Sequence, residues 1–126
     1  MGYIDIEAAL QAMVADELLY DACAKPLPAS FTMPHVCVDL LNAADINRAQ
    51  AIYNVNLDCR AATYEEAAEM QCAVADWARG LEGREIDGRP CYMLDTLRLQ
   101  RIQPDASNEG AILATVSAGL RVRIAD

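Results

Sequence analysis

VNLDCRAATYEEAAEMQCAVADWARGL, residues Val55 to Leu81, changes its hydrophobic period at Thr63. Before Thr63 apolar and polar side chains alternate, which predicts a strand with one dry face and one wet face. After Thr63 apolar residues recur every three or four positions, which predicts an amphipathic helix. Because each dry surface needs a cover, the stretch predicts a helix folded back over a sheet. The helical stripe consists of Ala67, Met70, Val74, Trp77 and Leu81.

Signals for the helix ends support this interpretation. Thr63 can act as an N-cap, and Glu66 three residues later completes a capping box. Gly80 and Gly83 end the helix. A second helix is predicted near the N-terminus, where Asp5 can cap a segment with apolar residues at helical intervals. That segment must end before Pro26, because proline cannot continue a helix.

Alternating residues predict four strands. Pro34 opens the first strand without losing a needed ladder bond. The last strand is the most regular, with an apolar residue at every second position from 112 to 124. The predicted strands are residues 34–41, 53–61, 91–102 and 112–124, and the predicted connections are residues 42–50, 82–90 and 103–110.

These patterns predict an α+β fold with the order α-β-β-α-β-β. We expect a four-stranded, mainly antiparallel sheet that carries both helices on one face. The length of 126 residues predicts one domain spanning residues 1–126. Aromatic residues make up only 6% of the chain, so the core should be thin and built from small side chains.

Neither a membrane span nor a secretory signal is expected. Charged residues interrupt every apolar run before the roughly 18 residues that a spanning helix needs. The five cysteines are an odd number without a C-x-x-C pair, so we expect them to be free thiols that behave as small buried hydrophobes. With one histidine in the chain, a histidine-based metal centre lacks partners.

The charge is acidic and unevenly distributed. The formal net charge is −9, which repels phosphate and opposes specific nucleic-acid binding. Residues 1–87 hold 15 acids and 5 bases, whereas residues 88–126 hold 4 acids and 5 bases. This asymmetry either serves solubility or creates two unlike surfaces for head-to-tail contact between copies.

Candidate catalytic groups are few. The sequence His35-x-Cys37-x-Asp39 places three reactive side chains on one strand face, but neighbours at i and i+2 lie about 6.6 Å apart, too far for a catalytic hydrogen bond. We therefore interpret them as an exposed or inter-subunit polar face. The pairs Glu65/Glu69 and Glu66/Glu69 lie one helical turn apart on a solvated surface. No catalytic, cofactor-binding or metal-binding residue is predicted, and the protein is not expected to be an enzyme.

Arginines concentrate near the C-terminus. Arg98, Arg101, Arg121 and Arg123 could grip phosphate, but no aromatic residues are interleaved with them. Arginine is also enriched at protein interfaces, where its planar fork binds carboxylates. We favour the interface role for Arg98, Arg121 and Arg123, which we expect to pair with acids of a neighbouring copy. The candidate partners are Glu65, Glu66 and Glu69.

The segment from Val55 to Leu81 resembles the central part of siphophage tail terminator and minor tail or minor capsid proteins. In that family a strand ends in a short turn that leads into a Tyr-x-x-Ala helix and then a leucine. The corresponding residues here are Arg60, Ala61, Tyr64, Ala67, Val74 and Leu81. MPHVCVDLL resembles the family's proline-initiated strand and GAILATVSAGLRVRI its closing strand, so the resemblance spans roughly residues 34–124.

The resemblance implies a structural role without a cofactor. Members of this family form rings, commonly hexamers, at the head-proximal end of the phage tail, where the ring ends polymerisation of the tail tube. The implied partners are further copies of the chain, the tail tube protein and the head–tail connector protein. The implied location is the virion tail, after assembly in the cytoplasm of the host bacterium. Two alternatives stay open: another adaptor protein of the phage neck or tail, and a small α+β enzyme or ligand-binding module.

Overall fold

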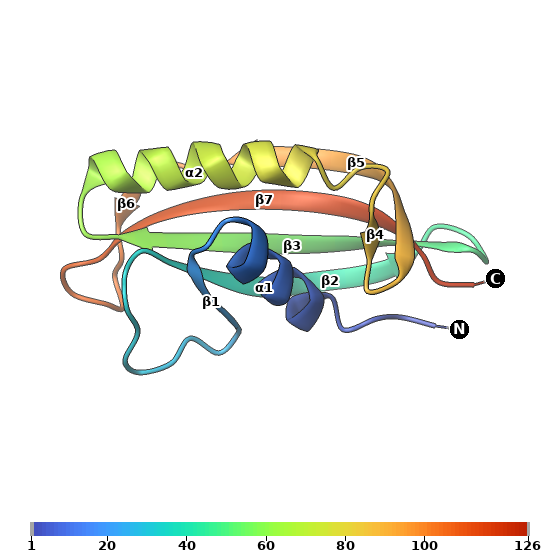
Figure 1. Ribbon diagram of the computed structural model, residues 1–126, viewed down its shortest axis with the longest axis horizontal. Coiled ribbons are helices and arrows are strands. Elements are labelled where there is room, and N and C mark those ends of the chain that lie inside the picture. The colour runs from blue at the N-terminus through green and yellow to red at the C-terminus, as the bar shows by residue number, and fades with distance from the viewer. Residues whose placement is uncertain (1, 126) are drawn as a thin grey trace.

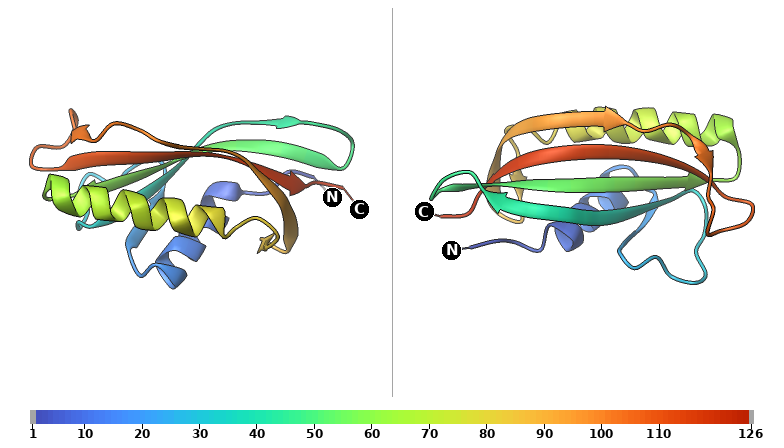
Figure 2. Two further views of the ribbon diagram at one scale, coloured as in Figure 1. Left: turned by 90° about the horizontal axis from the view of Figure 1, so that it is seen from above. Right: turned by 180° about the vertical axis from the view of Figure 1, so that it is seen from behind.

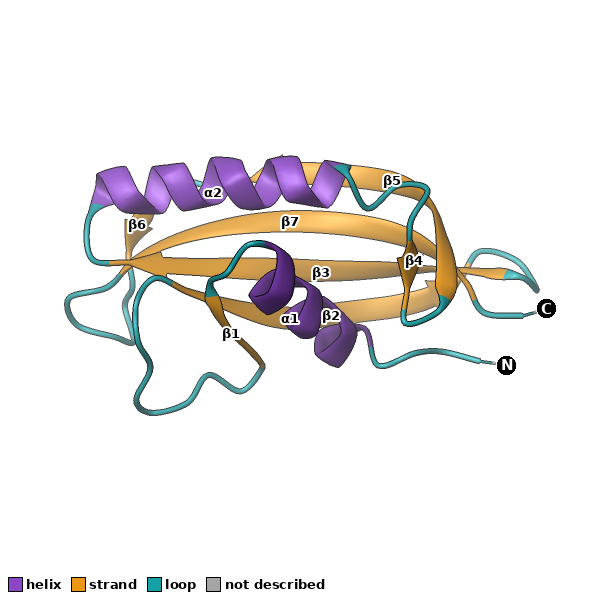
Figure 3. Ribbon diagram, viewed as in Figure 1, coloured by secondary structure: helices purple, strands orange, loops and turns teal. Residues whose placement is uncertain are grey.

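The computed structural model describes residues 2–125 and is dominated by strands (Figure 1). Two helices flank one side of a long sheet, and Figure 3 separates the helices from the strands by colour. In chain order the elements are α1 (Ile6–Glu17), β1 (Asp21–Ala24), β2 (His35–Asp45), β3 (Gln50–Ala61), α2 (Tyr64–Arg79), β4 (Glu85–Ile86), β5 (Arg89–Leu99), β6 (Gln103–Pro104) and β7 (Ile112–Arg123).

All described strands belong to one sheet of mixed direction. Its order is β1-β2-β3-β7-β5-β4, and β6 pairs with β7 beside this path. β1 runs parallel to β2, whereas every other neighbouring pair is antiparallel. Both helices lie on one face of the curved sheet, and the other face is open (Figure 2). We call this second surface the open face.

The predicted four-stranded, mainly antiparallel α+β fold with the order α-β-β-α-β-β is therefore wrong. The sheet has seven strands, and one of its pairs is parallel. The strands that were missed are β1, β4 and β6, which have four, two and two residues. β4 and β6 are too short to show a period of two, which needs about four or more residues, and the β1 sequence DACA does not alternate between polar and apolar residues.

Two predicted connections are also corrected. Residues 82–90 contain the tight hairpin between β4 and β5, whose two turn residues Asp87 and Gly88 have φ angles of 52° and 75°. Asp-Gly is a strong signal for such a turn, because both central residues must adopt positive φ. Residues 42–50 are mostly strand, since β2 continues to Asp45 and β3 begins at Gln50.

The long central strands β3 and β7 form the middle of the core. In β3 the odd-numbered residues from Ala51 to Ala61 are buried under the helices, and their even-numbered neighbours face the other way. In β7 the buried set is even-numbered, from Ala114 to Ile124. The core is mostly aliphatic with several alanines, and its largest fully buried side chain is Tyr53.

Both predicted N-cap residues, Thr63 and Asp5, cap their helices. The Oγ1 of Thr63 accepts a hydrogen bond of 3.2 Å from the backbone N–H of Glu66, as expected for an N-cap. Asp5 caps α1 by accepting from the backbone N–H of Ala8. No helix within residues 2–125 combines the length and the hydropathy that a membrane crossing requires.

Candidate functional site

The open face carries rows of polar side chains that connect neighbouring strands. Asn54 Nδ2 donates to Asn42 Oδ1 at 2.8 Å, which joins β3 to β2. Thr115 Oγ1 donates to Asp58 Oδ1 at 2.8 Å, which joins β7 to β3. The open face is thus an ordered polar surface. Polar residues on this face alternate along each strand with buried apolar residues, as in a sheet that is covered on one side only.

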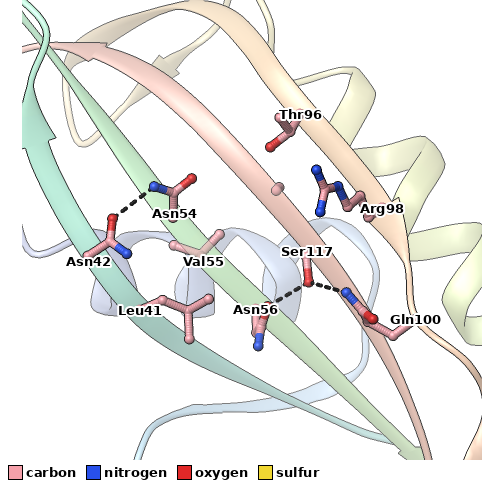
Figure 4. A pocket seen from close by; sticks show the side chains of 10 residues that line it. Leu41, Asn42, Asn54, Val55, Asn56, Thr96, Arg98, Gln100 and Ser117 are labelled. Atoms are coloured by element: carbon pink, nitrogen blue, oxygen red, sulfur yellow. Dashed lines mark hydrogen bonds between the residues drawn. The ribbon is translucent and has the colours of Figure 1, made fainter.

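A shallow hollow lies at the centre of the open face (Figure 4). Its volume is about 450 Å³, and four strands contribute to it. The residues that line it are Leu41, Asn42, Asn54, Val55, Asn56, Thr96, Arg98, Gln100, Ser117 and Ala118. No acidic residue is among them, so this is a neutral-to-basic hollow on a protein with a net charge of −9.

A chain of hydrogen bonds fixes one wall of the hollow. Ser117 Oγ donates to Asn56 Oδ1 at 2.7 Å, and Gln100 Nε2 donates to Ser117 Oγ at 3.1 Å. These contacts hold the amide groups of β3 and the end of β5 in fixed orientations (Figure 4). The side-chain oxygen of Asn56 accepts one of these bonds, and its amide group can still donate.

Gly119 lets the strands approach closely beside the hollow. A Cβ at this position would lie 2.8 Å from Thr96 Oγ1 and 3.1 Å from Asn54 Oδ1. Both distances are shorter than an ordinary contact, so only glycine fits between the side chains of β3 and β5 without movement.

Arg98 is the free cation of the hollow. Its guanidinium group points over the hollow from β5, opposite Ser117 in the register (Figure 4). Within residues 2–125 no carboxylate lies within 4.0 Å of it. A guanidinium group without a partner, surrounded by amide and hydroxyl groups, is suited to bind a carboxylate supplied from outside the chain.

The other two predicted interface arginines already have partners. Arg121 Nε lies 3.0 Å from Asp95 Oδ1, although the angle is not that of a hydrogen bond. Arg123 Nε donates to the carbonyl oxygen of Ala125 at 2.6 Å. Their capacity to bind an external carboxylate is therefore smaller than that of Arg98.

The predicted acidic partners lie on the opposite side of the molecule. Glu65, Glu66 and Glu69 are exposed on α2, which covers the face of the sheet away from the hollow. The structure thus does not bring them close to Arg98 within one chain. Arg101 lies beyond the end of β5, outside the residues that line the hollow.

His35, Cys37 and Asp39 share the open face near the β1 edge. We expected an exposed or inter-subunit polar face here, but His35 and Cys37 are buried within the chain itself. Their exposed fractions are 5% and 2%. His35 Nε2 lies 3.2 Å from the Sγ of Cys23 on β1. Asp39 forms an ion pair of 3.2 Å with Lys25. Within the described residues no group of three or more His, Cys, Asp or Glu side chains is arranged to hold a metal ion.

Met70 and Trp77 belong to the packed side of α2. Met70 is buried, and the partly buried Trp77 donates from Nε1 to Glu17 Oε1 at 3.1 Å. Glu17 also forms an ion pair with Arg84, so α1 is fastened to α2 and to the segment after it. These contacts lower the pKa of Glu17, chiefly through the hydrogen bond from Arg84.

One buried ion pair stabilises the end of the sheet next to α2. Arg60 Nε donates to Asp105 Oδ2 at 2.7 Å, and both side chains are nearly inaccessible. Burial acts to raise the pKa of Asp105, but hydrogen bonds from Arg60, Asn108 and the Ser107 backbone N–H outweigh it and lower the pKa.

Sequence reasoning missed most residues of the hollow. The wet side of the predicted strand 53–61 contains Asn54 and Asn56, so the sequence did indicate that these two residues are on a polar face. Their contacts with Thr96, Gln100 and Ser117 depend on the order in which the strands pair, which alternation does not specify.

Comparisons with known proteins identify the fold. No protein-family model matches the chain, and no curated protein sequence matches it. Among solved structures it is similar to a chain from the virion of a native gene transfer agent particle, with a TM-score of 0.53 and 16% sequence identity. The alignment covers 96% of this chain and 99% of that chain. At this identity the similarity establishes a shared fold over nearly the whole length of both chains.

Proposed function

We propose that the protein is a non-catalytic structural component of a phage-like virion. In this proposal copies join head to tail into a hexameric ring that caps the tail tube. The ring ends polymerisation of the tube and provides the surface on which the head–tail connector binds. Assembly takes place in the cytoplasm of the host bacterium, and the finished ring resides in the virion tail.

The full-length fold similarity to a virion chain carries this proposal. The match covers 96% of this chain and 99% of the other, so the two folds correspond over nearly their whole lengths. The resemblance of residues 34–124 to tail terminator and minor tail proteins is an independent argument from sequence. Both arguments favour the same class, a phage structural protein.

The two faces of the molecule suit a head-to-tail contact. The hollow around Arg98 lies on the open face, and the exposed acids of α2 lie on the covered face. A ring requires that one surface of each copy meets a different surface of the next. We assign the carboxylates of Glu65, Glu66 and Glu69 of the next copy as partners of Arg98.

Apolar contacts would supply most of the affinity, because exposed ion pairs contribute only about 0–1 kcal/mol each. Leu41 at the hollow is 53% exposed, and Met93 on β5, which pairs with Arg121, is 42% exposed. These two side chains lie on the open face beside its polar centre. The ion pairs would then set the register of the contact.

The test compares assembly of the wild-type protein with two matched variants in low salt. Arg98→Glu removes the free cation of the hollow, and Arg101→Glu makes the same charge change outside it. Analytical ultracentrifugation and negative-stain imaging, with and without tail tube protein, report the assembly. We expect closed rings from the wild type and Arg101→Glu, and few from Arg98→Glu.

A second assay tests the capping role. Tail tube protein polymerising with the wild-type protein should give shorter tubes than tail tube protein alone. If no ring forms and tube lengths are unchanged, the tail-terminator proposal is wrong. Binding to a connector but not to the tube would favour another neck adaptor, and a monomer that holds a small molecule in the hollow would favour a ligand-binding module.

A further inference from the structure

β1 places a second cysteine beside Cys37. Cys23 and Cys37 are direct partners in the parallel register of β1 and β2, so their side chains leave the sheet on the same face. Neighbouring strands lie about 4.8 Å apart, and disulfides span Cα separations of about 4.4–6.8 Å. The backbone therefore already holds the pair near the separation that a disulfide needs.

His35 provides a base for one thiol of this pair. Its Nε2 lies 3.2 Å from Cys23 Sγ, and the ring of Phe31 packs against the imidazole with 5.3 Å between centroids. Burial lowers the pKa of His35, which favours the neutral imidazole at neutral pH. A neutral Nε2 can accept the proton of Cys23 and thereby generate the reactive thiolate.

The two cysteines differ in accessibility. Cys23 is only partly buried, whereas Cys37 is 2% exposed. Burial is the main reason that the pKa of Cys37 is raised to about 12, and the hydrogen bond with Cys23 adds to it. Cys23 is therefore suited to react first with a soluble oxidant, and Cys37 to react second with Cys23.

The remaining cysteines lack such a neighbour. Cys59 and Cys91 are buried, and their partners in the register are not cysteines. Cys72 is exposed on α2. Among the five, only Cys23 and Cys37 stand opposite each other on adjacent strands.

We propose that Cys23 and Cys37 form a disulfide when the protein meets a hydroperoxide. Cys23 passes its proton to His35, and its thiolate sulfur attacks one oxygen of hydrogen peroxide. The O–O bond breaks, the second oxygen leaves as water with the proton from His35, and Cys23 becomes a sulfenic acid. The sulfur of Cys37 then attacks the sulfur of Cys23, and the hydroxyl group leaves with the Cys37 proton as a second water.

The disulfide would fasten the edge strand β1 to the sheet. β1 has four residues, lies at one edge of the sheet and pairs with β2 alone. A covalent link from β1 to β2 closes the segment between Cys23 and Cys37 and restricts the unfolded chain. We expect a higher midpoint of thermal unfolding for the oxidised protein. This inference does not depend on the proposed function.

Mass spectrometry of the peroxide-treated full-length protein tests the inference. Trypsin should release residues 1–48 as one fragment, because Lys25 precedes proline, and Cys23 and Cys37 are its only cysteines. We expect this fragment to take up two N-ethylmaleimide groups before oxidation, none afterwards, and two again after dithiothreitol. Chymotryptic cleavage after Phe31 should then leave two peptides joined by the disulfide.

Serine variants separate the steps. Cys37→Ser should leave Cys23 as a sulfenic acid that dimedone labels, whereas Cys23→Ser should leave Cys37 unmodified. Cys72→Ser is the matched control and should form the disulfide at the wild-type rate. If both thiols of the wild-type fragment remain free at a peroxide dose that oxidises Cys72, or if Cys23 pairs with another cysteine, the inference is wrong.

Discussion

Gly119 and the Arg60–Asp105 pair are the residues on which the geometry of the sheet depends most directly. Gly119 allows side chains of β3 and β5 to approach each other over β7. Arg60 and Asp105 bury opposite charges where β3 meets the segment after β6. In each case the loss of folding stability on substitution follows from the clash that a new side chain would make or from the charge that would lose its partner.

Gly119→Ala should destabilise the protein by about 1–3 kcal/mol, because the new methyl group would lie 2.8 Å from Thr96 Oγ1. Thr96 is β-branched and has little freedom to turn away. Urea unfolding measures the loss. Adding Thr96→Ala should recover part of it, and a double variant as unstable as the single one would show that the clash is not with Thr96.

Asp105→Asn should cost about 3 kcal/mol at neutral pH, since it leaves the buried charge of Arg60 unpaired. The pKa of Asp105 is lowered in the folded protein, so the pair contributes its full stability above the ordinary aspartate pKa of about 3.9. That contribution is lost as the pH falls through the lowered pKa.

The difference in unfolding free energy between wild type and Asp105→Asn should therefore shrink below about pH 4. Urea unfolding over a series of pH values measures it. The matched control is Asp95→Asn, whose more exposed pair with Arg121 should be worth less than about 1 kcal/mol. If the difference in unfolding free energy between wild type and Asp105→Asn stays constant down to low pH, the lowered pKa of Asp105 is not what stabilises the pair.

At the scale of elements, long periodic segments could be predicted and short ones could not. The period change at Thr63 and its capping signal located α2, and β7 was visible because its alternation persists from one end to the other. β6 has too few residues for a period and β1 has no alternation, so only tertiary pairing defines them. The same limit hid Cys23 from the sequence, because its meeting with His35 depends on β1 pairing parallel to β2.

Thr63→Ala should destabilise the protein by about 1 kcal/mol, because the N–H of Glu66 loses the Oγ1 that accepts its hydrogen bond. Thr63→Ser keeps that oxygen and should stay close to wild type. Chemical unfolding monitored by far-UV circular dichroism compares the two. Equal losses in both variants would mean that the methyl group of Thr63, not its hydroxyl, matters.

The two faces of the whole molecule differ in the charged side chains they carry, which is one of the two interpretations that the uneven charge of the sequence left open. What the sequence could not specify is how these charges are distributed in space. The acids of α2 lie over the covered face, and Arg98 lies in a hollow without acidic residues on the open face. A head-to-tail contact places Arg98 of one copy against the acids of α2 of the next, so opposite charges meet. A contact between two open faces would instead bring the two Arg98 side chains together.

This arrangement predicts that two defective variants repair each other. Arg98→Glu gives a copy with acids on both surfaces, and Glu65→Lys with Glu69→Lys gives a copy with cations on both surfaces. Alone, each variant places like charges at every contact and should assemble poorly in low salt. Mixed in equal amounts, they can alternate, so that every hollow meets an oppositely charged helix.

Alternation closes only in a ring with an even number of copies, so recovery in the mixture also tests the proposed hexamer. Mass photometry of each variant and of the mixture provides the measurement. Far-UV circular dichroism of each variant should match wild type, which separates loss of assembly from loss of folding. If the mixture stays as unassembled as its components while the wild type forms rings, these charges are not paired at the interface. The proposal that the protein forms a ring would still stand.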